Sequence, residues 1–398
     1  MNRILDLMGG WRPAIADLLL GGMLIGLILS PPFLQAGVKE QARRIHDRLA
    51  GVPPQASVLA QMETQISANN DPLAAAYLAM EHPAFYDVTL KNFAAPWTNE
   101  EQSLFVPLND YSATVIGMVR DEVPFNQLLS ADLLYQGDPA LGLPPYSPAN
   151  NDHYEALETS GVPLKDALVA APQSDLNGLP ATATAGVITS RQAARAFFIA
   201  GTNRAMFRFT LLNHLCLDLE QVKDTSRAAD RVRQDIPRSP GGDSRLFLNN
   251  CVGCHAGMDP LVQAYAYYDY DEAAGRLLYT PDQVRPKYLI NADNFKPGYV
   301  TPDDQWDNYW RAGPNALLGW DSALPGSGNG AKSLGVELAN SQAFASCQAK
   351  KVFKAVCLRE PVDSADHAQI AAMSDSFRAN NYSLKRLFAE SAVYCRGE

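Results

Sequence analysis

Five consecutive residues, Cys251-Val-Gly-Cys254-His255, combine two thiols and an imidazole at a spacing that can attach a haem. In this C-x-x-C-H motif the thiols add across the porphyrin vinyl groups, and the histidine reaches the iron from one face as its proximal ligand. With six Cys and six His in 398 residues, chance produces such a pentapeptide in about one comparable sequence in a thousand. The motif therefore predicts one covalent haem c.

Three other uses of two nearby cysteines compete with haem attachment: half of a zinc site, a thioredoxin-like redox pair and a structural turn. A zinc site needs a second pair of ligands close by, and the sequence has neither a second C-x-x-C nor an H-x₃₋₅-H. A redox pair comes after a strand and opens a regular helix, whereas Gly257 and Pro260 would interrupt a helix beginning at this motif. Covalent haem is the favoured interpretation, and these alternatives stay open.

The sequence leaves open which group fills the sixth position on such an iron. Met258 comes three residues after the proximal histidine, too close to reach the opposite haem face, and is expected to line the pocket. Met373 and His214 are the main candidates, although each lies in an apolar helical pattern where a core side chain is the usual role. Met206 and His367 are two further candidates, and other residues or an open position remain possible.

Other side chains near the motif could contact the haem. Arg204 and Arg245 could each pair with a propionate, although a solvated arginine is the favoured role for each. Tyr268 and Trp306 belong to an aromatic-rich stretch and are expected to contact the macrocycle, with packing against the helices as the alternative.

The other four cysteines are disulfide candidates, because this kind of haem attachment takes place outside the cytoplasm. Four cysteines allow three pairings. The preferred pairs are Cys216–Cys347 and Cys357–Cys395, and four buried free thiols are the alternative.

The amino terminus contains an uncharged run, residues 18–38, between Asp17 and Lys39. About 20 apolar residues suffice to cross a bilayer. A signal peptide cleaved after Ala36 is the competing interpretation, but Leu34 is bulky where a small residue is preferred. We therefore expect a single N-terminal transmembrane helix, with the protein anchored in the inner membrane and most of the chain in the periplasm.

The rest of the chain predicts a mainly α fold with long irregular loops, because its apolar residues recur at helical spacing and no strand alternation is convincing. The expected parts are a membrane anchor or uncleaved signal (1–38), a stalk (39–71), an N-terminal helical segment with a Pro-rich loop (72–188), a helical haem c domain (189–340) and a C-terminal helical pair (341–398).

Two parts of the chain resemble a known family. Gly201-Thr-Asn-Arg204, the motif and the subsequent Asp259-Pro-Leu261 resemble the haem-bearing domain of an uncharacterised cytochrome-like family of planctomycetes and proteobacteria, and Phe344-x-x-Cys347 through Tyr382-Ser-Leu384 is similar to its short helical C-terminal domain. The resemblance covers residues 75–395 and implies a monohaem c protein without an established substrate. The chain departs from the family at Cys357-Leu-Arg-Glu-Pro361, which makes a bond from Cys357 particular to this chain.

Composition narrows the function. The chain has Lys+Arg 33 against Asp+Glu 43, a net charge of −10, which argues against binding nucleic acid. We expect electron transfer with a redox protein or a membrane respiratory complex. The alternatives are a peroxidase-like haem enzyme with an open iron and an accessory haem subunit of a larger membrane complex.

Overall fold

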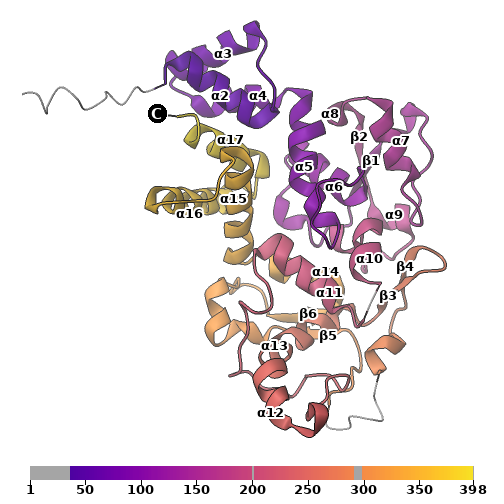
Figure 1. The fold of residues 1–398 in the computed structure, drawn as a ribbon. Helices are drawn as coiled ribbons and strands as arrows, with labels where there is room; N and C mark the ends of the chain where they lie inside the picture. The colour runs from indigo at the N-terminus through magenta and orange to yellow at the C-terminus, as the bar shows by residue number, and fades with distance from the viewer. Residues whose placement is uncertain (1–35, 200, 291–297, 398) are drawn as a thin grey trace, which may run out of the picture.

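The protein is described by a computed structural model, and the described residues are 36–199, 201–290 and 298–397. These residues are mostly helical, as the apolar spacing predicts, and irregular loops join the helices (Figure 1). The α-helices are α2 (Val38–Ala50), α3 (Ala56–Ser67), α4 (Pro72–Met80), α5 (Lys91–Ala94), α6 (Asp110–Arg120), α7 (Asp152–Ser160), α8 (Leu164–Ala167), α9 (Gln173–Asn177), α10 (Arg191–Phe197), α11 (Arg204–Thr210), α12 (Ser244–Leu246), α13 (Val252–Val262), α14 (Gly330–Ala339), α15 (Gln342–Cys357), α16 (Ser364–Ala379) and α17 (Leu384–Tyr394).

Within the described residues the strands are short and form three separate two-stranded antiparallel sheets. The pairs are β1 (Leu134–Gly137) with β2 (Leu168–Ala171), β3 (Tyr268–Asp271) with β4 (Arg276–Tyr279), and β5 (Gln305–Asp307) with β6 (Ser327–Asn329). Three π-helical turns interrupt or extend the helices: η1 (Phe85–Leu90), η6 (Leu211–Leu215) and η8 (Phe247–Cys251). Short 3₁₀ turns, among them η2 (Ala95–Thr98) and η11 (Tyr309–Arg311), supply much of the remaining backbone order.

The expectation of a membrane-spanning helix is wrong for the described part of the chain. No helix there is long and apolar enough to cross a membrane. The longest, α15 and α16, have 16 residues each, which at 1.5 Å per residue falls short of a hydrocarbon core about 30 Å thick. The inner-membrane anchor is therefore not supported, and the apolar run that suggested it lies almost entirely outside the described residues.

The amino-terminal helices pack against the carboxyl-terminal ones (Figure 1). Residues 39–71, expected as a stalk, instead form α2 and α3. The apolar stripe of α2 is fully buried, and Arg48 donates to the carbonyl of Cys357 at the end of α15, over 2.9 Å. Both ends of the described chain thus belong to one helical layer.

The carboxyl-terminal layer has three helices where the sequence predicted two. Each begins at a side-chain cap: Ser341 before α15, Asp363 before α16 and Ser383 before α17 each accept a backbone N–H from the first turn. Asn381 and Tyr382, both at positive φ, separate α16 from α17. The predicted helix beyond Pro361 is therefore broken in two.

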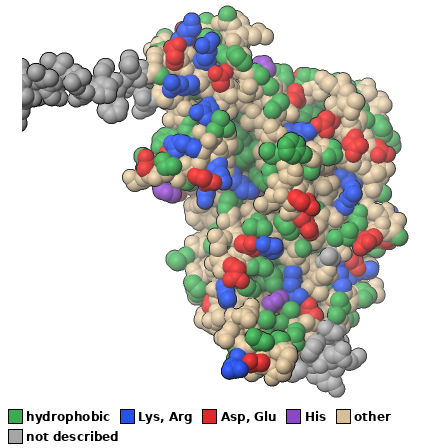
Figure 2. Space-filling view, viewed as in Figure 1, with side chains coloured by type: hydrophobic (Ala, Val, Ile, Leu, Met, Phe, Trp, Pro, Cys, Tyr) green, Lys and Arg blue, Asp and Glu red, His purple; other side chains and the backbone are tan. Residues whose placement is uncertain are grey.

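The C-x-x-C-H motif lies at the other end of the molecule. Figure 1 shows α12 and α13 far from α2–α4, with α11 and α14 between them and the upper layer. The chain runs from α12 through η8 into α13 without a loop, and π-helical turns are frequent at functional sites. On the face shown in Figure 2, acidic and basic side chains alternate rather than forming a field of one sign.

Candidate functional site

The C-x-x-C-H motif starts at the end of η8 and occupies the first turn of α13. Gly257 and Pro260 were expected to interrupt a helix beginning at the motif, but both lie inside α13, so that argument against a redox pair is wrong. Nine of the eleven residues in α13 are buried, and the two that are not are Cys254 and His255. Cys251, directly before the helix, is also partly exposed. Positions i, i+3 and i+4 share one face of a helix, so the three motif side chains lie on the accessible side of α13.

Close packing on the opposite side holds α13 in this orientation. A Cβ at Gly257 would lie 1.9 Å from Nε1 of Trp310, so only glycine allows this approach. A Cβ at Gly253 would lie 2.6 Å from Cγ of Lys223, and the carbonyl of Gly253 accepts from the N–H of Asp224 over 2.9 Å. Both glycines of the motif region therefore serve packing.

His255 is oriented from below by a buried carboxylate. Its Nδ1 lies 3.1 Å from Oδ1 of Asp259, one turn further along α13, and the Asp259 side chain is 0% exposed. Burial alone would raise the pKa of Asp259, but the adjacent Arg204 guanidinium outweighs it and holds that pKa far below its usual range. Because the carboxylate is ionised and can only accept, Nδ1 donates to it, and in the neutral imidazole the lone pair is therefore on Nε2.

A network of charges fixes that carboxylate. Arg204 donates to both oxygens of Asp259, over 2.9 and 3.0 Å, and also to both oxygens of Asp235, over 2.5 and 3.0 Å. The backbone N–H of Arg233 adds a further bond to Asp259 over 3.1 Å. In this structure Arg204, expected near a propionate, is fully engaged with two carboxylates.

The two motif thiols are not bonded to each other. Cys251 packs beside a small apolar cluster that includes Phe247 and Val252. Burial raises the pKa of the Cys254 thiol, which disfavours the acidic thiolate of a redox pair. Two exposed apolar side chains lie just before the motif: Leu246, at the end of α12, is 43% exposed, and Leu248, in η8, is 56% exposed. An apolar ligand lying over the motif would cover part of this surface.

The other expected contact residues have partners inside the protein or lie on its surface. Met258 is buried, the Tyr268 hydroxyl donates to the carbonyl of Ala183, and Trp306 Nε1 donates to the Ser333 hydroxyl. Haem contact by these side chains stays a prediction. The other propionate candidate is exposed and bonded to its neighbour two residues earlier, as the pair Arg245 and Asp243.

The candidates for the sixth position are spread over the fold. Met373 is buried on α16, which Figure 1 places well away from α13, and His367 is exposed on the same helix. His214 is buried, its Nε2 lies 2.6 Å from the Tyr111 hydroxyl, and its pKa is lowered by burial. Met206 is buried on α11, which packs against α13.

Both preferred disulfides are present. Cys216–Cys347 joins the end of η6 to α15, with a Cα–Cα distance of 5.3 Å. Cys357–Cys395 joins the end of α15 to the end of α17, with 5.5 Å. The second bond thus joins two helices of the carboxyl-terminal layer, and the first joins that layer to the segment that precedes the motif in the chain. Such bonds are typical of an oxidising compartment.

The prediction of a metal-binding group is wrong for residues 36–199, 201–290 and 298–397. Nowhere in them are three or more His, Cys, Asp or Glu side chains grouped to hold a metal ion. The motif side chains lie along one face rather than converging on a point. A haem iron makes a different demand, since the macrocycle supplies most of its ligands and the protein one or two.

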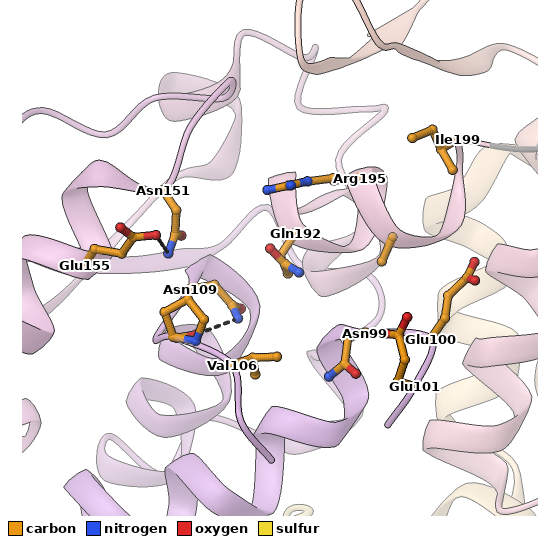
Figure 3. A pocket seen from close by; sticks show the side chains of 12 residues that line it. Asn99, Glu100, Glu101, Val106, Asn109, Asn151, Glu155, Gln192, Arg195 and Ile199 are labelled. Carbon is orange, nitrogen blue, oxygen red and sulfur yellow. Dashed lines mark hydrogen bonds between the residues drawn. The ribbon is translucent and has the colours of Figure 1, made fainter. Parts of the chain in front are cut away.

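Away from the motif, a polar hollow lies between α7, α10 and the loop after η2. Figure 3 shows Glu155 and Asn151 on one side of it, Glu100 and Glu101 on the other, and Arg195 across the top. Its volume is about 470 Å³. Carboxylates and an arginine are mixed here, so the hollow selects neither sign of charge.

Comparison with known proteins adds no relative: no family model, no curated protein and no solved structure matches this chain. The resemblance to the uncharacterised haem-bearing family therefore stays a prediction. Sequence reasoning also missed the supporting residues. The spacing of His255 and Asp259 is a helical i, i+4 pair that could have been noticed, whereas Arg233 and Asp235 carried no local signal.

Proposed function

We propose that this chain carries one haem c, attached through Cys251 and Cys254 with His255 as proximal ligand, and transfers single electrons to and from another redox protein. The observation that supports this most is the surface of α13, where only the motif residues are accessible while the rest of the helix is buried. A helix that exposes two thiols and an imidazole, and little else, is suited to a ligand that all three hold together.

The residues present fit that group chemically. Two free thiols supply the attachment, and the Asp259 carboxylate keeps the Nε2 lone pair of His255 available. A carboxylate behind a ligating histidine fixes both its tautomer and its ring orientation. When bound, the haem supplies reversible one-electron chemistry, and the protein's part is to hold and tune it.

Charge suggests the kind of partner. The chain has a net charge of −10, and complementary potentials steer redox partners together. We expect a soluble or membrane-bound redox protein with a basic docking surface, and no role for nucleic acid.

A haem protein with an open iron position is the second candidate, because the four candidate sixth ligands lie on elements away from the accessible side of α13 or are buried in the core. Such an iron would bind small ligands and permit peroxide or oxygen chemistry.

The test is the optical spectrum and intact mass of the full-length protein produced in cells that mature c-type cytochromes. We expect one covalent haem per chain. A low-spin spectrum unchanged by carbon monoxide supports the electron carrier, and a carbon monoxide shift selects the open iron. The His255→Ala variant should lose the low-spin spectrum, whereas His367→Ala, at an exposed histidine on α16, should keep it. Absence of covalent haem from the wild type would overturn the proposal.

A further inference from the structure

A hollow of about 460 Å³ lies where α5, η2, η6 and α15 meet, in the upper half of the molecule. Three lysines of α15, at positions 350, 351 and 354, line it, and no Asp or Glu does. This composition is unusual for a chain with a net charge of −10. A concave site with charges of one sign concentrates the opposite charge.

Lys351 is the most constrained of the three. Its Nζ donates to the carbonyl of Asn213 over 2.5 Å and lies 4.4 Å from the ring centroid of Trp97. Burial, helped by the neighbouring Lys354, lowers the pKa of Lys351 to about 7. The side chain is thus held at the wall of the hollow without a counter-charge.

The other two lysines differ in their partners. Lys354 forms an ion pair with Glu360 over 2.5 Å. Neither Lys350 nor Lys351 pairs with a carboxylate anywhere in the described parts of the chain. Both lysines therefore line the hollow without a carboxylate partner; Lys350 is exposed, and Lys351 is fully charged only below a pH of about 7.

Aromatic and aliphatic side chains line the hollow beside the lysines. Phe93 and Trp97 pack edge to face with centroids 4.8 Å apart, and Pro96 and Leu212 continue the surface. Asn92 and Gln102 also line the hollow. A site that combines lysines with rings discriminates by charge and by shape together.

We propose that this hollow binds a small aromatic anion, a carboxylate or sulfonate, with its charged group at Lys350 and Lys351 and its ring against Phe93 and Leu212. Ligand pockets of about 300–1,000 Å³ accept molecules of one or two rings. None of the C-x-x-C-H residues belongs to this site, so the proposal stands independently of the haem.

The experiment is calorimetric titration of the full-length protein with 1-naphthalenesulfonate, alongside the uncharged 1-naphthalenemethanol and inorganic sulfate. We expect the sulfonate to bind and the other two to bind at least about tenfold more weakly, because the alcohol lacks the anionic group and sulfate lacks the ring. Equal binding of the alcohol would overturn the role of the lysines, and equal binding of sulfate would overturn the role of the rings.

Three variants locate the site. Lys351→Met keeps the stem over Trp97 and should weaken the sulfonate about tenfold, and Lys350→Gln, at an exposed position that folding does not need, should weaken it several-fold. Lys39→Gln, an exposed lysine on α2, is the matched control and should change nothing. Unchanged affinity in both α15 variants, or a preference for a polyglutamate peptide over the sulfonate, would overturn the proposal.

Discussion

Nδ1 of His255 and Oδ1 of Asp259 are 3.1 Å apart across one turn of α13. The same carboxylate also accepts bonds from Arg204 and from the backbone of Arg233, so its position is set by three separate segments. A ligating histidine that donates its second N–H to a carboxylate is held in one tautomer and made more basic. Buried residues therefore decide which imidazole nitrogen faces outward.

If the chain carries the proposed haem, replacing Asp259 with Asn should raise its reduction potential. The amide carries no charge and accepts more weakly, so the imidazole becomes a poorer electron donor to the iron. Potentiometric titration followed optically measures the change. Asp243→Asn, at an exposed carboxylate bonded to Arg245, is the control and should leave the potential unchanged. A potential equal to that of the wild type in Asp259→Asn would show that this carboxylate does not tune the iron.

The charge network beneath the motif should also make stability depend on pH. Removing one partner of a buried ion pair costs about 3–5 kcal/mol, so Arg204→Met should lower the free energy of unfolding by about that much at neutral pH. The pKa of Asp259 is lower in the folded state than in the unfolded chain. Its stabilisation is therefore complete above the unfolded pKa and is lost as the pH falls below it.

The difference in the free energy of unfolding between wild type and Arg204→Met should accordingly shrink by about 1 kcal/mol per pH unit as the pH falls below roughly 4. Urea denaturation from neutral pH downward measures it. Arg245→Met, which removes an exposed arginine, should behave as wild type throughout. A difference independent of pH would mean that Asp259 titrates alike in both states.

The motif and its surroundings were predictable to different depths. The type and spacing of Cys251, Cys254 and His255 are local, and the helical phase that exposes them together comes from i, i+3 and i+4. The two disulfides were also preferred correctly, since only four further cysteines had to be paired. The network under His255 was not predictable, because Arg233 meets Asp259, and Asp235 meets Arg204, only through the tertiary fold.

The fold was predictable where apolar spacing is strong and uninterrupted. The helices after Ser341 match their apolar stripes, but the break at Asn381 and Tyr382 depends on positive-φ backbone that those residue types only weakly favour. Residues 39–71 are polar enough to suggest a stalk. The narrow stripe of α2 nevertheless finds a partner in α17, a contact between the two ends of the chain. The lysine-lined hollow likewise joins distant segments and left no trace in the sequence.

Gly257→Ala should destabilise the protein. The added Cβ would lie 1.9 Å from Nε1 of Trp310, a residue that is 1% exposed and has little room to move. Overpacking of this kind costs about 1–3 kcal/mol. Urea denaturation measures the loss of stability. Because Trp310→Leu removes the clashing ring, Gly257→Ala should cost less stability in the Trp310→Leu background than in the wild type. A Gly257→Ala protein as stable as wild type would mean that α13 and Trp310 can move apart without loss of stability.

The two disulfides should differ in their contributions. Cys216–Cys347 closes 131 residues of sequence separation and Cys357–Cys395 only 38. On the chain-entropy account, losing the longer loop costs about 1 kcal/mol more than losing the shorter one. Paired Cys→Ser variants of each bond, compared by urea denaturation, give the order. Equal losses, or the reverse order, would place the effect in native contacts rather than in the unfolded chain.

The titration of Lys351 should make the free energy of unfolding of the protein increase as the pH rises. Its pKa is lowered from an ordinary 10.5 to about 7, so between these values the unfolded chain binds more protons than the folded one. Stability then increases with pH across that window.

Lys351→Met removes the titrating group, and the stability of the variant relative to wild type should fall by up to about 1 kcal/mol per pH unit between roughly pH 7 and pH 9. Lys350→Gln, at an exposed neighbour, should track the wild type. Urea denaturation of the three proteins across this range measures the effect, and parallel curves for Lys351→Met and wild type would mean that solvent reaches Nζ and that the lysine titrates normally.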